Sequence, residues 1–255
     1  MRWTLPGLQV SFRLVLLSLC WLCASAHAVE EITLFSYQHK PPYVIDGKRQ
    51  QGLYYDLAEQ LNAYLPQYRF VVRQIPRRRL DYLLSKDQLD GIVLGTSPDW
   101  FGDAPRHLWT EAFIDDANLL VSRSQGEVSR LSADQLGGRR LGVVSGHRYP
   151  ELDDLLGKER ISREAGISES ANLLRLQRGW LGAAVIGKRT LDFYFQEQQG
   201  LRSQLYVAQP PLRTYQRSLL VPTGYARLLP ELNRVIGTLK QAPSWQHRLE
   251  QYRTP

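Results

Sequence analysis

The segment Ser145–Pro150 carries the residue types best suited to bind a charged solute. It reads Ser-Gly-His-Arg-Tyr-Pro and follows a short apolar stretch that we expect to form a strand. At a strand-to-helix turn, free backbone N–H groups and the helix dipole favour anions. Arg148 could add a cation at this turn. The pattern therefore predicts an anion contact at Arg148, and the plainer alternative is an exposed arginine at the start of a helix.

Residues that could perform acid–base catalysis are present, but their spacing does not require it. The candidates are His39, His107 and His147, together with Asp99, Asp103 and Glu111, which lie close to His107 in the sequence. A general acid or base in a cleft would need such residue types. Residues of these types, however, more often lie at the surface or cap a helix. The sequence has no His-x-x-x-His or His-Glu-x-x-His motif, no phosphate-loop lysine motif and no Gly-x-Gly-x-x-Gly motif. We expect no catalytic residue, no metal site and no cofactor.

The N-terminus has the pattern of a cleavable secretory signal. A positive region precedes the apolar stretch Leu14–Cys23, which is shorter than the roughly 20 residues of a membrane span. Ala26-His27-Ala28 then places small residues at the two positions that a signal peptidase reads. We expect cleavage after Ala28 and a periplasmic mature protein. Both cysteines lie within the removed residues 1–28, so the mature protein would contain no thiol and no disulfide.

The composition is that of a globular protein with scattered charge. Hydrophobic residues make up 43% of the 255 residues, charged residues make up 22%, and the net charge is +7. This balance argues against disorder. The basic residues do not cluster beyond the run Arg77–Arg79. Because a nucleic-acid surface needs such clustering on one face, we expect no nucleic-acid partner.

Strands alternate with helices along the chain, and this order predicts an α/β protein with mostly parallel, doubly wound sheets. In the first part we expect strands at 31–36, 69–75 and 90–95, with helices after Gly52 and from Pro76. In the second part we expect strands at 118–122, 140–145, 183–186 and 218–221, a helical turn at 132–138, and helices at 168–178, 189–198, 228–241 and 244–252. The helix after Gly52 is the clearest, because its leucines recur every four residues and form one apolar face.

Several short motifs follow one another in a characteristic order. They are Pro41-Pro42-Tyr43, Gly52 with Asp56-Leu57, Leu89-Asp90-Gly91, Trp109-Thr110-Glu111-Ala112-Phe113, Leu136-Gly137-Gly138-Arg139-Arg140-Leu141-Gly142-Val143 and Ser145-Gly146. In this order and spacing the chain resembles the periplasmic solute-binding proteins of extracellular family 3, the polar amino-acid receptors of ABC transporters. The resemblance covers essentially all of residues 29–255.

The resemblance implies a two-lobe, type II periplasmic-binding-protein fold whose lobes close on a ligand by hinge motion. Lobe I would comprise residues 29–116 and 216–255, and lobe II residues 117–215. The crossover strands would pass near Asp115-Asp116 and Tyr215-Gln216. A small-molecule ligand that contacts both lobes would favour the closed state, which an inner-membrane ABC permease would recognise. The protein would work as a monomer.

The sequence departs from the family at the positions that hold an α-amino acid. Counted without gaps from the third strand, Gly102 stands where the family has the arginine that binds the ligand carboxylate through its guanidinium fork. The second-lobe aspartate that meets the ammonium group falls at Gly187, and the acidic position of the first loop falls at Tyr37. The usual clamp is therefore absent. Arg148 could supply the missing cation from the opposite lobe.

The residues predicted to bind the ligand are Tyr37, Thr96, Ser97, Trp100, Arg148 and Tyr149. The resemblance places Thr96 and Ser97 where the family uses hydroxyl and backbone groups, with a simple turn as the alternative. Tyr37 and Trp100 would form aromatic walls, with ordinary packing as the alternative for Trp100. Lys40 could face the cleft or solvent, and Arg78 and Arg79 could reach the cleft mouth or lie on a solvated helix face. For all three, exposure to solvent is the favoured interpretation.

Three functions fit these observations. The first is a non-catalytic periplasmic substrate-binding protein that captures a small polar or anionic solute for an ABC transporter. The second is an enzyme on the same scaffold, similar to the periplasmic cyclohexadienyl dehydratases. The third is a free sensory module that docks on a membrane receptor. The signal, the two-lobe pattern and the lack of a catalytic spacing favour the first.

Overall fold

A computed structural model describes residues 29–102, 104–126, 130–152 and 161–252. The expected secretory signal, residues 1–28, lies outside the described residues, and so does Asp103. From Glu31 onward the chain forms one compact unit. No described helix combines the length and the apolar character that crossing a membrane requires.

The strands of the described residues are joined side by side in the order β2-β1-β3-β10-β5-β8-β6-β7. Their bounds are β1 Glu30–Ser36, β2 Tyr68–Gln74, β3 Ile92–Thr96, β5 Ile114–Arg123, β6 Arg140–Val144, β7 Ser162–Gly166, β8 Ala183–Gly187 and β10 Arg213–Val221, with β4 Leu108–Trp109 paired to β10 and β9 Leu205–Val207 paired to β5. β1 pairs with β3 in parallel, and β6 pairs in parallel with both β7 and β8. β5 and β10 run antiparallel to each other and to their other partners. The sheet is therefore mixed, because two antiparallel strands cross its middle.

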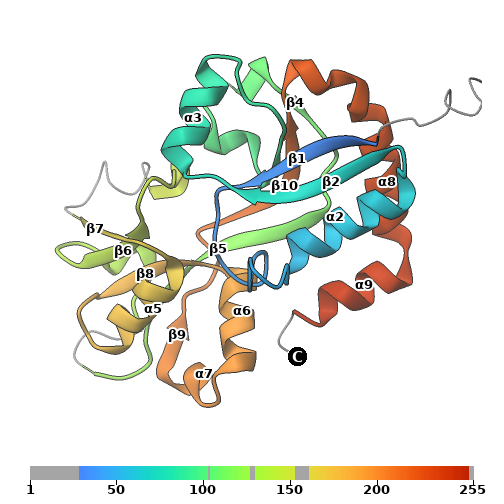
Figure 1. Cartoon of the computed structure of the whole chain (residues 1–255). Coiled ribbons are helices and arrows are strands. Elements are labelled where there is room, and N and C mark those ends of the chain that lie inside the picture. The colour runs from blue at the N-terminus through green and yellow to red at the C-terminus, as the bar shows by residue number, and fades with distance from the viewer. Residues whose placement is uncertain (1–28, 103, 127–129, 153–160, 253–255) are drawn as a thin grey trace, which may run out of the picture. The chain divides into compact units, whose positions relative to one another are not determined.

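Helices connect the strands (Figure 1). The α-helices are α2 Leu53–Tyr64, α3 Arg77–Ser85, α5 Glu169–Gln177, α6 Lys188–Glu197, α7 Leu201–Gln204, α8 Leu229–Gln241 and α9 Pro243–Glu250. Short 3-10 helices are η1 Pro98–Trp100, η2 Ala104–Arg106, η3 Ala133–Gln135 and η4 Thr223–Leu228. α5 begins as expected, because the Ser168 hydroxyl accepts a hydrogen bond from the Ala171 N–H and caps the helix.

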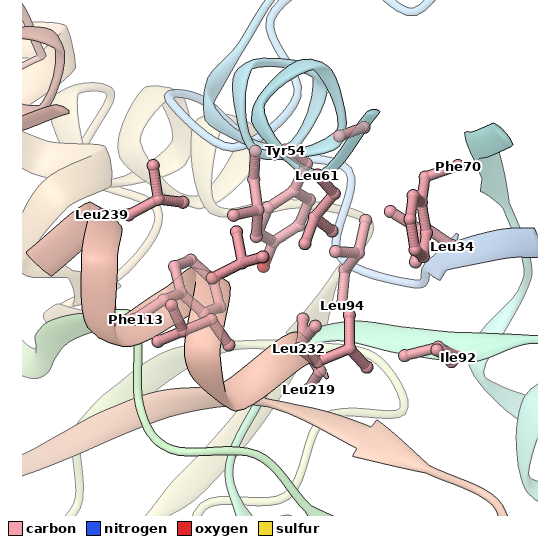
Figure 2. Packing of buried hydrophobic residues seen from close by; sticks show 14 of the residues in the cluster. Leu34, Tyr54, Leu61, Phe70, Ile92, Leu94, Phe113, Leu219, Leu232 and Leu239 are labelled. Carbon is pink, nitrogen blue, oxygen red and sulfur yellow. The ribbon is translucent and has the colours of Figure 1, made fainter. Parts of the chain in front are cut away.

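Two cores form on the opposite faces of β1, β3 and β10, because successive side chains of a strand point to opposite sides. Ile92 and Leu94 of β3 pack with α2 and α8, whereas Val93 packs with α3 on the other face. Figure 2 shows the first of these cores, where Leu61 of α2 and Leu232 of α8 approach the strands. Burial of each such side chain stabilises the fold by about 1.5–3 kcal/mol. We call the elements around these two cores the first lobe.

A second pair of cores surrounds the other half of the sheet. Ala184 and Ile186 of β8 pack with α5, α6 and α7. Ala183 and Val185 of the same strand pack on the opposite face with Leu141 of β6. We call the elements around these two cores the second lobe. Both halves of the chain thus form a sheet with apolar side chains on its two faces, as a doubly wound arrangement requires.

β5 and β10 belong to both lobes. β10 pairs with β3 and β4 at one end and with β5 at the other, and β5 continues to β8 and β9. Asp116 lies opposite Tyr215, and Asp115 lies opposite Gln216. These are the residue pairs at which the crossovers were expected. The residue bounds of the two lobes remain a prediction.

Some strands differ from the sequence-based expectation for identifiable reasons. β7 reads Ser-Arg-Glu-Ala-Gly and was not predicted, because it ends the order of strands and has no alternating apolar pattern. β5 and β10 begin earlier than predicted. Their first residues include the buried charged residues Asp116 and Arg217, which do not look like strand residues in the sequence.

Truncation of Leu61 tests the core between α2, α8 and the sheet. Leu61 is completely buried, so Leu61→Ala should lower the free energy of unfolding by about 2–5 kcal/mol through lost burial and a cavity. Urea denaturation measures this change. Leu174→Ala on α5 is the matched control, since Leu174 is 46% exposed and its truncation should change stability by less than about 1 kcal/mol. Equal losses in the two variants would contradict the described packing.

Candidate ligand-binding site

A cleft between the two lobes gathers polar and aromatic side chains from several segments. The residues that line it are Tyr37, Gln38, Lys40, Arg77, Trp100, Asn118, His147, Arg148, Tyr149, Glu169 and Tyr215. Their side chains leave about 20 Å³ of open space, which is room for a single water molecule. A larger solute therefore reaches the cleft floor only when side chains or lobes move apart.

A larger pocket adjoins this cleft and shares Arg77 and Arg148 with it. Its volume is about 550 Å³, and its other lining residues are Asp81, Leu84, Phe101, Gly102 and Gly146. We call it the outer pocket. A volume of roughly 300–1,000 Å³ is typical of small-molecule sites. The outer pocket therefore has room for a small solute, with cations from opposite lobes on its walls.

Arg77, the first residue of α3, is held in place by several contacts. Its Nε donates to Asp81 Oδ1 at 2.8 Å, and its Nη2 donates to the Trp100 carbonyl oxygen at 2.9 Å. The guanidinium carbon also lies 5.0 Å from the ring centre of Tyr37 and 4.6 Å from that of Phe101. Cation–π contacts of this kind orient a guanidinium. Because the group is already ordered, an anion that binds it costs little further side-chain entropy.

Arg148 reaches the same pocket from the second lobe, in the turn after β6. Its side chain is exposed, and it pairs with no carboxylate among the described residues. A side chain at Gly102 would begin 3.3 Å from Arg148 Nη1, so the glycine leaves space for the guanidinium. Position 102 is where the resemblance would place an arginine and this sequence has a glycine. A cation from the opposite lobe thus lies beside that position.

Lys40 and Glu169 form an ion pair across the cleft. Lys40 Nζ lies 2.6 Å from Glu169 Oε1, and both side chains are more than nine-tenths buried. Glu169 is the first residue of α5, where the helix dipole favours a negative charge. Its Oε2 accepts a hydrogen bond from the Gly187 N–H at 3.0 Å. A side chain at Gly187 would begin 2.9 Å from Lys40 Nζ, so this glycine also makes room for a cation from the opposite lobe.

Beneath the cleft, Arg217 of β10 is completely buried with Asp116 of β5. Arg217 Nη2 donates to Asp116 Oδ2 at 2.8 Å, and Nη1 donates to the Gly95 carbonyl oxygen at 2.6 Å. Burial alone would raise the pKa of Asp116. The charges of Arg217 and Lys40 and a hydrogen bond from Tyr43 outweigh burial and hold the pKa of Asp116 below its usual value.

His147 is neutral at physiological pH. Burial, followed by the positive charges of Lys40, Arg77 and Arg217, lowers the pKa of His147 to about 3. Its ring packs edge-on against Tyr37, with the ring centres 6.0 Å apart. The cations that add to the effect of burial on this pKa would also attract an anion.

The structure brings four of the six predicted ligand residues together. Tyr37, Trp100, Arg148 and Tyr149 line the cleft. Thr96 and Ser97 are buried beneath it and are absent from its lining, and the Thr96 hydroxyl lies 3.5 Å from the Tyr37 hydroxyl.

Two of the predicted aromatic residues, Trp100 and Tyr149, also make contacts within the protein interior. Trp100 lies edge-on to Tyr215, with ring centres 4.9 Å apart, and it belongs to the core around α3. The Tyr149 hydroxyl accepts a hydrogen bond from the Val144 N–H at 3.1 Å. Both side chains therefore support the cleft wall as well as facing it.

The expectation of solvent exposure was wrong for Lys40 and correct for Arg78 and Arg79. Lys40 is buried because Glu169, 129 residues away in the sequence, compensates its charge. Arg78 and Arg79 are exposed. Sequence reasoning also missed Arg77, whose only signal is the run of three arginines at the start of a helix.

Among the residues considered for catalysis, His147 lies in the cleft. His39 Nδ1 lies 2.6 Å from Gln74 Nε2, and Asp99 is ion-paired with Arg213. His107 and Glu111 do not line the cleft. Within the described part of the chain, no group of three or more His, Cys, Asp or Glu side chains is arranged to hold a metal ion.

A separate hollow of about 740 Å³ lies against β5, β10 and α6. Its lining residues are Asp115, Asp116, Ala117, Lys188, Arg189, Asp192, Pro211, Thr214, Tyr215 and Gln216. Lys188 Nζ lies 2.5 Å from Asp192 Oδ2, and Gln216 Nε2 donates to Asp115 Oδ1 at 3.0 Å. Because these polar groups are engaged with one another, the outer pocket is the better candidate for a charged solute.

Solved structures share this arrangement of strands and helices. A mutant of ArgBP from T. maritima matches with a TM-score of 0.71 at 17% identity, covering 87% of this chain and 94% of its own. The substrate-binding protein of an amino acid ABC transporter matches with a TM-score of 0.68 at 17% identity, covering 87% and 98%. The GluR0 ligand-binding core from Nostoc punctiforme, in complex with L-glutamate, matches with a TM-score of 0.68 at 16% identity, covering 89% and 100%. The chain has the two-lobe fold of type II periplasmic binding proteins.

The fold expected from the resemblance is thus confirmed. No family model and no curated protein matches the sequence. In a type II binding protein, closure around a ligand moves one lobe about the strands that join it to the other. In this type II fold those strands, β5 and β10, carry the buried pair of Asp116 and Arg217.

Substitution of Asp116 tests the dependence of the fold on this buried pair. Asp116→Asn leaves the Arg217 charge buried without its counter-ion, so it should cost about 3–5 kcal/mol of stability. Because the pKa of Asp116 is lowered in the folded state, its contribution is present above pH 3.8 and is lost as the pH falls further. Denaturant unfolding at pH 7 and pH 3 measures both effects. Asp115→Asn, on the exposed neighbouring residue, is the control, and a loss as large in this variant would refute the assignment.

Substitution of His147 tests whether burial and the cleft cations lower the pKa of this histidine and keep it neutral. The unfolded chain takes up a proton at His147 below pH 6.5, whereas the folded chain does so only near pH 3. Stability should therefore fall as the pH decreases from 6.5 toward 3, and His147→Gln should lose less stability over this range. Urea unfolding at pH 7 and pH 4.5 gives the comparison. His247→Gln, at an exposed position on α9, should retain the wild-type dependence. An unchanged slope in His147→Gln would show that the histidine is not held neutral.

Proposed function

We propose that this chain is a periplasmic substrate-binding protein that captures a small anionic solute between its lobes and delivers it to an inner-membrane ABC transporter. The observation that carries the proposal is the meeting of Arg77 and Arg148, from opposite lobes, at one pocket of about 550 Å³. A solute that binds both cations interacts better with the closed arrangement than with the open one. Its binding therefore stabilises closure.

The surroundings of the outer pocket support an organic anion. Arg77 is ordered by its neighbours, and Arg148 has no carboxylate partner among the described residues. The side chains of Leu84 and Phe101 line the same pocket, and the Phe101 ring lies beside Arg77, so apolar parts of a solute would find apolar surface close to the charge.

Export and transport are the finer parts of the proposal. Export is supported by the signal pattern of residues 1–28. Transport is supported by the likeness in fold to the substrate-binding protein of an amino acid ABC transporter. A non-catalytic role is supported by the likeness in fold to binding proteins and by the engagement of His39 and Asp99 in other contacts.

Removal of the Arg148 guanidinium tests the proposal. A thermal-shift and calorimetric panel of dicarboxylates, aromatic carboxylates, opines, amino acids, polyamines and sugars should identify carboxylate ligands of the wild-type protein. Hydrogen bonds to charged groups contribute about 1.5–3 kcal/mol, so Arg148→Ala should weaken binding by roughly ten- to a hundredfold.

Arg139→Ala, an exposed arginine at the entrance to β6, is the matched control and should bind like the wild type. Binding of polyamines or neutral sugars in preference to carboxylates would rule out an anion receptor. A carboxylate affinity that survives Arg148→Ala would rule out the proposed geometry.

A further inference from the structure

The cleft contains a carboxylate, but the chain itself occupies both of its oxygens. Among the described residues that line the cleft, Glu169 is the one acidic side chain. Its Oε1 contacts Lys40 Nζ at 2.6 Å, and its Oε2 accepts from the Gly187 N–H at 3.0 Å. The acid is 3% exposed, so solvent does not compete for these positions. A ligand would have to break one of these contacts to use Glu169 as an acceptor.

The outer pocket offers no better acceptor for a positive group. Its described acidic residue, Asp81, is paired with Arg77 Nε at 2.8 Å. Arg148, on the opposite wall, is a further cation. A positive group on a ligand would therefore meet like charges there, and repulsion between like charges is a common means of rejecting a wrong ligand.

Together these contacts define the chemical class of the solute. We propose that Lys40 is a specificity-determining residue: its ammonium group fills the position that a ligand ammonium would take, so the solute is a small carboxylate without an ammonium group. This inference rests on the proposed function and refines it. The carboxylate binds at Arg77 and Arg148, and Lys40 with Glu169 rejects the corresponding α-amino acids.

The geometry explains why Lys40 holds this position. Gly187 has no side chain, and a Cβ there would begin only 2.9 Å from Lys40 Nζ. Displacing Lys40 would break a buried ion pair, which is a large cost for any ligand to overcome. An amino acid would have to offset that cost with its own ammonium group. The same acid without the ammonium group leaves the internal pair intact.

Calorimetry on matched pairs of ligands tests the inference. The protein expressed from the full chain is titrated with glutarate and glutamate, succinate and aspartate, and 3-phenylpropanoate and phenylalanine. We expect at least one carboxylate to bind, and its amino acid to bind at least about tenfold more weakly. Lys40→Met frees Glu169 Oε1, so this variant should gain affinity for the amino acid and reduce the ratio by about tenfold or more. Lys40→Met/Glu169→Gln is the matched control, in which no gain of amino-acid binding is expected.

The outcomes separate this inference from the proposed function. If the wild type binds an amino acid as tightly as its carboxylate partner, or more tightly, the inference is overturned while the solute-binding role stands. This comparison needs no variant, so poor folding of Lys40→Met would not remove the test. An unchanged ratio in a folded Lys40→Met protein also overturns the role of Lys40. If neither the wild type nor Lys40→Met binds any of the six compounds, the proposed function fails, and the inference fails with it.

Discussion

The guanidinium group of Arg217 is completely buried where β10 passes from one lobe to the other. Its positive charge therefore needs a counter-ion and hydrogen-bond acceptors from neighbouring residues. Asp116 on β5 supplies the counter-ion, the Gly95 carbonyl at the end of β3 accepts a hydrogen bond, and Gln38 after β1 accepts another. An uncompensated buried charge is so unfavourable that these four segments have to adopt mutually consistent positions. The floor of the cleft and the strands between the lobes are therefore parts of one electrostatic arrangement.

Two glycines near the cleft leave room for cations that reach across from the opposite lobe. Gly102 in the first lobe leaves space for Arg148 of the second, and Gly187 in the second lobe leaves space for Lys40 of the first. In each case a glycine in one lobe leaves room for a cationic side chain from the other lobe. Because Glu169 is paired with Lys40, the charges that remain available on the cleft lining are those of Arg77 and Arg148.

Local patterns in the sequence were sufficient to predict much of the fold but little of the charge pairing. The leucine spacing of α2 and the cap at Ser168 depend on neighbouring residues, and both were predicted. Arg148 was also identifiable, since the turn that carries it is a local feature. Lys40 and Arg217 were not, because their partners Glu169 and Asp116 lie 129 and 101 residues away and a lone charged residue in a sequence usually indicates exposure. Only the tertiary fold brings such partners within hydrogen-bonding distance.

The cations on the outer pocket also influence a solute before it makes contact. A charge that faces water acts over a Debye length of about 8 Å at physiological ionic strength, and concave walls of low polarity concentrate its field. Arg148 is exposed on the wall of this pocket, and about one-tenth of the Arg77 side chain is accessible there. Diffusion of an anion toward the molecule is therefore biased toward the gap between the lobes. Added salt would weaken this long-range bias, whereas contacts at hydrogen-bonding distance within the pocket would be much less affected.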